Sequence, residues 1–164
     1  MIHHSIDPVY DQNSRILILG SFPSVKSRES EFFYGHPQNR FWKVLAAVFN
    51  QDVPAEVLQK KAFLLRNHIA LWDVIGSCDI TGSSDSTIKN VTANDISRIL
   101  SEADIRFIYV NGKTAQKYYN RYLRDSLGIE AICLPSTSPA NAGWNLPRLV
   151  ESWSRIRLDI SQAK

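Results

Sequence analysis

Side chains that could bind or act on a polar ligand are concentrated in three short segments of this sequence. The first is Gly20-Ser21-Phe22-Pro23-Ser24, and the second, residues 31–45, places rings, an amide and a guanidinium around a Gly and a Pro. The third, Pro135-Ser136-Thr137-Ser138-Pro139-Ala140-Asn141, is rich in hydroxyl groups. Hydroxyl and amide groups suit phosphate oxygens, and the carboxamide of Asn39 can orient a water although it cannot act as a base. These residue types indicate a site for a phosphate-bearing ligand.

Each of these residues also has an ordinary structural interpretation that the sequence leaves open. Asn39 could only cap a helix that opens at Arg40. Phe22 and Tyr34 could be core rings, and a Ser beside a Pro most often belongs to a turn. Asp73, a carboxylate near an apolar run, could cap a helix or a loop.

Four continuous apolar runs predict the strands that must position these segments, because short runs bounded by turn residues are typical of buried parallel strands. They comprise residues 15–20, 69–76, 105–110 and 129–134. Helical patterns cover residues 39–49, 54–67, 92–102, 112–124 and 146–158. Thr92 with Asp95 resembles a capping box, and Pro147 suits a first helical turn. The alternation predicts an α/β fold, a three-layer α/β/α sandwich with a central four-stranded, mostly parallel sheet, in a single domain over residues 1–164.

This sheet also predicts where the site lies, because ligands of such sheets bind beyond the carboxyl ends of the strands. The first and third polar segments directly follow the first and fourth predicted strands. Asp73 falls near the end of the second strand, and Asn111 follows the third. Residues 76–90, which contain Gly82-Ser83-Ser84-Asp85-Ser86, are expected to form a loop.

Composition excludes several classes of protein and site. With 164 residues, 44% hydrophobic residues and a net charge of +3, the chain suits one globular domain and permits a phosphate-backbone partner. No apolar stretch approaches the roughly 18 residues of a membrane span, and no signal peptide is visible, so we expect a cytoplasmic protein. Cys78 and Cys133 are interpreted as buried thiols rather than a disulfide.

A metal site is the main inorganic alternative. The possible ligands are His3, His4, His36, His68, Cys78 and Cys133. No pair has the close spacing of zinc sites. We therefore expect neither a metal nor another cofactor, and we place His36 in the pocket or at a phosphate.

The motifs, taken together, resemble a known family. Gly-x-x-Pro at residues 20–23 and Pro-x-Asn-Arg-Phe-Trp-Lys-Val at residues 37–44 are similar to the mismatch-specific uracil-DNA glycosylases. The segment 111–116, Asn-Gly-Lys-Thr-Ala-Gln, matches their Gly-Lys-x-Ala element, and residues 134–139 fall where they carry Leu-Pro-Asn-Pro-Ser. The resemblance spans residues 15–158 in order and spacing.

Two departures refine this resemblance. Phe22 stands where the mismatch-specific enzymes carry Asn and the classical uracil enzymes carry Asp, and Ser136 stands at the His or Asn of the second motif. The combination is similar to the hypoxanthine-DNA glycosylase branch of the uracil-DNA glycosylase superfamily, in which the Asn matching Asn39 supplies the catalytic amide. The departures shift the expected substrate from uracil towards deoxyinosine.

The resemblance implies a cofactor-free, monofunctional DNA repair glycosylase that binds double-stranded DNA as a monomer and flips out a deaminated base. Asn39 is then the catalytic residue, and Pro139-Ala140 corresponds to the wedge that enters the duplex. The implied base pocket comprises Gly20, Phe22, Tyr34, Asp73 and Asn111. Asp73 would accept the N1 proton of hypoxanthine. The implied DNA-binding residues are Ser21, Ser24, Lys113, Ser136, Thr137, Ser138 and Asn141.

Two rival functions remain open at this point. One is a mismatch-specific uracil or thymine glycosylase for G·U and G·T pairs. The other is a catalytically silent nucleic-acid-binding domain on the same scaffold, without a water-positioning group at Phe22. An unrelated α/β hydrolase is disfavoured because the sequence has neither a Gly-x-Ser-x-Gly turn nor a phosphate-cradling Gly loop.

Overall fold

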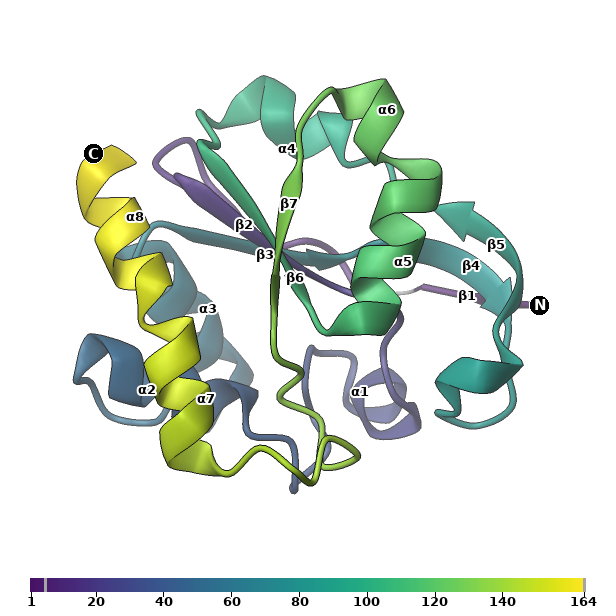
Figure 1. Cartoon of the computed structure of the whole chain (residues 1–164), viewed down its shortest axis with the longest axis horizontal. Coiled ribbons are helices and arrows are strands. Elements are labelled where there is room, and N and C mark those ends of the chain that lie inside the picture. The colour runs from purple at the N-terminus through teal and green to yellow at the C-terminus, as the bar shows by residue number, and fades with distance from the viewer. Residues whose placement is uncertain (5, 164) are drawn as a thin grey trace.

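The computed structural model describes residues 1–4 and 6–163 and has a parallel sheet at its centre (Figure 1). Its strands are β2 (Ile16–Gly20), β3 (Ile69–Asp73), β6 (Phe107–Asn111) and β7 (Ala131–Leu134), in the order β3-β2-β6-β7. All neighbouring pairs are parallel. The predicted four-stranded sheet is confirmed. The central strand β2 is buried on both faces, as its continuous apolar run requires.

Helices cover both faces of this sheet. Figure 1 shows α2, α3, α7 and α8 on one side and α5 and α6 on the other. The helices are α1 (Val25–Ser30), α2 (Phe41–Phe49), α3 (Val57–Arg66), α4 (Ser97–Glu102), α5 (Lys113–Tyr122), α6 (Arg124–Leu127), α7 (Leu146–Trp153) and α8 (Arg155–Ala163). Pro147 lies in the first turn of α7, as predicted. The predicted helix 146–158 is instead two helices, and the hydroxyl of Ser154 donates to the carbonyl of Val150 at the break.

The predicted loop 76–90 is correct only in its middle, because both of its ends belong to a second, antiparallel sheet. This sheet has the order β1-β4-β5, with β1 (Ile2–His3), β4 (Ile75–Asp79) and β5 (Lys89–Ala93). A short 3-10 helix, η1 (Asp85–Thr87), lies in the connection between β4 and β5. The register between β4 and β5 shifts twice, and β5 is largely exposed, so neither strand carries a clear apolar alternation in the sequence.

The strand β5 also makes the next helix begin later than predicted. Thr92 pairs with Ser77 in the antiparallel sheet, so it does not cap a helix. The helix α4 begins only at Ser97, and the predicted capping box with Asp95 is absent. Cross-strand pairing therefore outweighed the local helix signal.

The N-terminal segment ties the two sheets together. His3 pairs with Ser77 of β4, and the amide of His4 donates to the carbonyl of Gly76 at 2.6 Å. Val9 then exchanges two backbone hydrogen bonds with Leu71, on the outer edge of β3. Among the described residues, no helix has the length and apolarity that a membrane span requires.

Candidate active site

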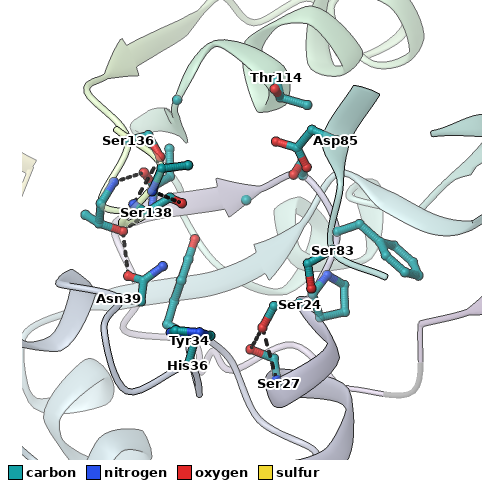
Figure 2. A pocket seen from close by; sticks show the side chains of 18 of the residues that line it. Ser24, Ser27, Tyr34, His36, Asn39, Ser83, Asp85, Thr114, Ser136 and Ser138 are labelled. Atoms are coloured by element: carbon teal, nitrogen blue, oxygen red, sulfur yellow. Dashed lines mark hydrogen bonds between the residues drawn. The ribbon is translucent and has the colours of Figure 1, made fainter. Parts of the chain in front are cut away.

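A pocket of about 540 Å³ opens beyond the carboxyl ends of β2, β3, β6 and β7, where the sheet topology predicts it. It is lined by every residue that the sequence placed in the site except Asn141. His36, Pro139 and Ala140 also line it, together with Ser83, Asp85 and Thr114, which the sequence did not single out. Figure 2 shows Asn39, Ser136 and Ser138 on one side of the pocket and Ser83 and Asp85 on the other.

Asn39 lies at one end of the pocket and is held by two hydrogen bonds. Its Oδ1 accepts from the amide of Phe41 and from the hydroxyl of Thr137, each at 2.9 Å. The hydroxyl of Thr137 in turn accepts from Nδ2 of Asn111 at 3.0 Å, and the Thr137 amide donates to Asn111 Oδ1 at 3.1 Å. Thr137 is fully buried. The result is a continuous chain of hydrogen bonds that fixes both carboxamides.

This arrangement changes which atom of Asn39 is available. The oxygen, which we expected to orient a water, has both lone pairs occupied by protein donors. The amide nitrogen is left, and Figure 2 shows it on the pocket side of the side chain. The sequence offered helix capping as the alternative to catalysis for Asn39. The N-cap of α2 is Arg40, without a side-chain cap bond, and Asn39, one residue earlier, accepts from the Phe41 amide while it lines the pocket.

Aromatic rings form part of the pocket wall. The ring of Tyr34 stacks on Phe41 with a centroid distance of 4.0 Å and an interplanar angle of 18°. Tyr34 adopts a left-handed backbone conformation with φ of 53°, a strained value for a side-chain-bearing residue. Its buried hydroxyl has no hydrogen-bond partner among the described residues. Burial, with the nearby charge of Asp73, raises the pKa of Tyr34, so the phenol stays neutral.

Phe22 is half-buried rather than fully in the core. Its ring meets the His4 ring edge to face at 5.9 Å, and the guanidinium of Arg28 lies 5.6 Å from its centroid. Phe22 therefore supplies an apolar surface at the position where the mismatch-specific enzymes carry an amide.

At the floor of the pocket, Gly20 lies very close to Asp73. A Cβ at Gly20 would lie 2.3 Å from Asp73 Oδ1 and 2.9 Å from the Tyr34 hydroxyl. Asp73 Oδ2 lies 2.8 Å from Nε2 of His4, and these side chains are only 5% and 1% exposed. Only glycine at position 20 leaves room for this buried carboxylate.

The side chain of Arg40 stabilises the loop that follows β7 through hydrogen bonds to its backbone. Its guanidinium donates to the carbonyl oxygens of Ser138 at 2.8 Å and Asn141 at 3.2 Å, and also to that of Trp144. Asn141 does not line the pocket, and its Nδ2 donates to the carbonyl of Ser136. The structure therefore gives Asn141 a place within the loop rather than in the pocket lining.

The remaining polar side chains differ in how free they are to meet a ligand. Ser24 caps α1, and its hydroxyl bonds within that turn. The hydroxyl oxygens of Ser136 and Ser138 each accept a hydrogen bond from a backbone amide. Their hydroxyl protons remain available to donate to a ligand. Lys113 is exposed at the first turn of α5. Ser21 lines the pocket beside these groups.

Asp85 is an unexpected acidic group on the opposite wall. Figure 2 shows it beside Thr114. Partial burial raises the pKa of Asp85, and a hydrogen bond from Thr114 opposes that shift. Sequence reasoning missed Asp85 because it treated residues 76–90 as a solvent loop.

His4 and Arg40 were also missed as contributors to the site. His4 is 69 residues from Asp73, and Arg40 is about 100 residues from the loop it binds. No spacing rule connects such pairs. Arg40 lies within the motif that carried the family resemblance, which was the one available signal.

Cys78 is fully buried as predicted, whereas Cys133 is half-buried, and both are free thiols. Burial raises the pKa of each thiol, which keeps both in the neutral form.

Comparison with known proteins identifies the family. Residues 8–157 match the family described as the uracil DNA glycosylase superfamily. The chain is 35% identical to a protein named hypoxanthine DNA glycosylase from Methanosarcina acetivorans, over 95% of this chain and 98% of that protein. It is 37% identical to a protein of the same name from Methanosarcina barkeri, over 82% of this chain and 85% of that protein.

A solved structure agrees with these sequence matches. The solution structure of a candidate uracil DNA glycosylase from Methanosarcina acetivorans superposes with a TM-score of 0.83 at 33% identity, and covers 98% of this chain and 99% of that one. The pocket lies at the carboxyl edge of the matched fold, and the matched region contains Asn39, Asp73, Asn111 and Thr137. The chain belongs to the uracil DNA glycosylase superfamily.

Proposed function

We propose that this protein is a monofunctional DNA glycosylase that removes hypoxanthine from deoxyinosine in double-stranded DNA. The observation that carries the proposal is the hydrogen-bonded chain Asn39–Thr137–Asn111, which presents two fixed carboxamides to one pocket. The names of the two Methanosarcina relatives support the choice of base. No cofactor is required for the reaction.

The reaction is a hydrolysis, so a water must attack the sugar. Oxygen of the water bonds to C1′ of the deoxyribose, the C1′–N9 bond breaks, and its electron pair leaves with the base. One water proton ends on the base and the other stays on the new C1′ hydroxyl. The amide nitrogen of Asn39 donates to the water and places it, while the oxocarbenium-like transition state develops on the sugar.

The flipped base is read by polar groups around one aromatic ring. It stacks on the face of Tyr34 opposite Phe41, beside the apolar surface of Phe22. The second N–H of Asn111 Nδ2, which Thr137 leaves free, donates to O6. Asp73 accepts the proton of N1.

The hydroxyl groups of the loop after β7 and of Ser21 and Ser24, with the ammonium of Lys113, bind the phosphates that flank the flipped nucleotide. Pro139 and Ala140, at the rim of the pocket, occupy the gap that the base leaves in the duplex. We expect the enzyme to act as a monomer in the cytoplasm.

Abasic-site formation tests the proposal directly. Duplexes that carry inosine, uracil or thymine opposite each base are incubated with the wild-type protein, treated with alkali and analysed for strand cleavage. We expect cleavage at inosine that is lost in Asn39→Ala, with duplex binding retained. Asn13→Ala, an exposed Asn at the opposite end of the sheet, is the matched control.

The other outcomes assign the rival functions. Stronger cleavage at G·U or G·T pairs than at inosine would make the protein a mismatch-specific uracil or thymine glycosylase. Binding without cleavage of any duplex would make it a silent nucleic-acid-binding domain and would refute the proposal.

A further inference from the structure

We infer that His4 is a positioning residue that makes Asp73 a single-oxygen reader of the base edge, and thereby selects hypoxanthine against adenine and guanine. The inference rests on the proposed function, because it concerns the same pocket. It assigns a role to the N-terminal segment, which no motif of the sequence covers.

The contact between His4 and Asp73 is short and shielded from solvent. Nε2 of His4 lies 2.8 Å from Asp73 Oδ2, and the two side chains are 1% and 5% exposed. His4 is brought there by the pairing of β1 with β4 and by the hydrogen bond that its backbone N–H donates to the carbonyl of Gly76. Its ring is packed edge to face against Phe22 and Trp72. Such packing leaves the imidazole little freedom to turn.

A second hydrogen bond determines which nitrogen of His4 carries the proton. The backbone amide of Ile6 donates to Nδ1 at 3.1 Å, so Nδ1 must be an unprotonated acceptor. In the neutral ring the proton then lies on Nε2, which donates it to Asp73 Oδ2. The neutral imidazole of His4 therefore donates a hydrogen bond to Asp73, and Oδ2 is the accepting oxygen.

Among the described residues, Oδ1 of Asp73 has no protein donor, whereas Oδ2 is held by His4, so we take Oδ1 as the oxygen that meets a ligand. Oδ1 lies against Gly20, where an added Cβ would approach it to 2.3 Å, and Asp73 is among the residues that line the pocket. Among the described residues, the phenol of Tyr34 also lies near this carboxylate, and burial keeps that phenol neutral. The pocket thus offers a base edge a single, fixed anionic acceptor.

This acceptor matches one class of base edge. Hypoxanthine presents a single N–H donor at N1, which one oxygen can accept. Adenine presents a lone pair at N1, which an anionic oxygen repels, so the parent base of hypoxanthine is rejected. Guanine presents donors at N1 and at its 2-amino group, and the second oxygen, which would complete a bidentate pair, is occupied by His4.

The experiment compares His4→Ala and His4→Gln with wild type on duplexes containing inosine, adenine or guanine at one position. Loss of one hydrogen bond to a charged group predicts that His4→Ala excises inosine about 10- to 100-fold more slowly. We expect its preference for inosine over adenine and guanine to narrow as well. Gln can donate to Asp73 and should restore most of the preference. His3→Ala, the exposed neighbour on the same strand, is the matched control.

A double variant separates positioning from a general structural role. If His4 acts through Asp73, His4→Ala combined with Asp73→Asn should be no slower than Asp73→Asn alone. Equal loss of rate on every substrate, with additive effects and an unchanged preference, would overturn the inference while leaving the glycosylase assignment intact. Absence of wild-type inosine cleavage would instead refute the proposed function and, with it, the specificity role. The ¹⁵N shifts of the His4 ring, measured by NMR, would still report whether Nε2 carries the proton.

Discussion

Replacing Thr137 by Val removes the hydroxyl at the centre of the hydrogen-bonded chain while keeping the shape of the side chain. Thr137 is fully buried, accepts from Asn111 and donates to Asn39. The substitution leaves the Asn111 amide with an unsatisfied donor, which should lower the free energy of unfolding by about 1–3 kcal/mol. Asn39 Oδ1 keeps only the Phe41 amide. If Asn39 is catalytic as proposed, a shift of its amide by about 1 Å should lower turnover by about 10- to 100-fold.

Thr137→Ser is the matched control for this prediction. It keeps the hydroxyl and loses one methyl group, which should cost about 1 kcal/mol of stability with little change in turnover. Turnover is measured under single-turnover conditions on an inosine duplex, and stability by urea unfolding. The reasoning is refuted if Thr137→Val stays folded and its turnover lies within about twofold of Thr137→Ser.

Four further perturbations test other parts of the structure. Gly20→Ala should reduce inosine excision by at least about tenfold, because its Cβ would lie 2.3 Å from the buried carboxylate oxygen, whereas Gly143→Ala, with nothing within 4 Å, should leave excision unchanged. Tyr34→Phe should raise the free energy of unfolding by about 1 kcal/mol, since it removes a buried hydroxyl without a partner in the described chain; urea unfolding measures this. Arg40→Lys should raise the KM for duplex by about tenfold, since an ammonium cannot replace the guanidinium that binds several loop carbonyls, and steady-state kinetics would contradict this if KM were unchanged. Burial raises the pKa of Tyr119 to about 12, above its ordinary value of 10.0, so its contribution to stability is complete below pH 10 and is lost as pH rises through 12. Tyr119→Phe should reduce the pH dependence of unfolding across that window by up to about 1.4 kcal/mol per pH unit.

The sequence predicted the parts of the fold that depend on local pattern. The strands β2 and β3 are continuous apolar runs because they are buried along their whole length, and this signal needs no knowledge of partners. The hairpin of β4 and β5 lacks such a signal. Its residues mix apolar and polar types without a clear alternation, its register is irregular and its outer strand is largely exposed, so only pairing in three dimensions defines it.

The site was predictable where motifs mark it and unpredictable where distant segments meet. Asn39 and Thr137 were found because they lie in segments that follow buried strands or open a helix. The sequence could not show that protein donors occupy the Asn39 oxygen, because the second donor is Thr137, which is 98 residues away. The role of His4 was missed for a related reason. Its position depends on β1, which is only two residues long and has no sequence pattern of its own.

The distance in sequence between Asn39 and Thr137 also has a consequence for synthesis of the protein. On a ribosome, which releases the chain from its N-terminus, β2, β3 and β6 emerge before the loop that holds Thr137. Until that loop has emerged, Asn39 Oδ1 can accept from the Phe41 amide but lacks its second donor, and the Arg40 guanidinium lacks the loop carbonyls that it binds. Closing so long a loop is slow compared with local helix formation. A nascent chain can therefore be largely folded and still inactive, and activity should begin only when the last fifth of the protein has been made.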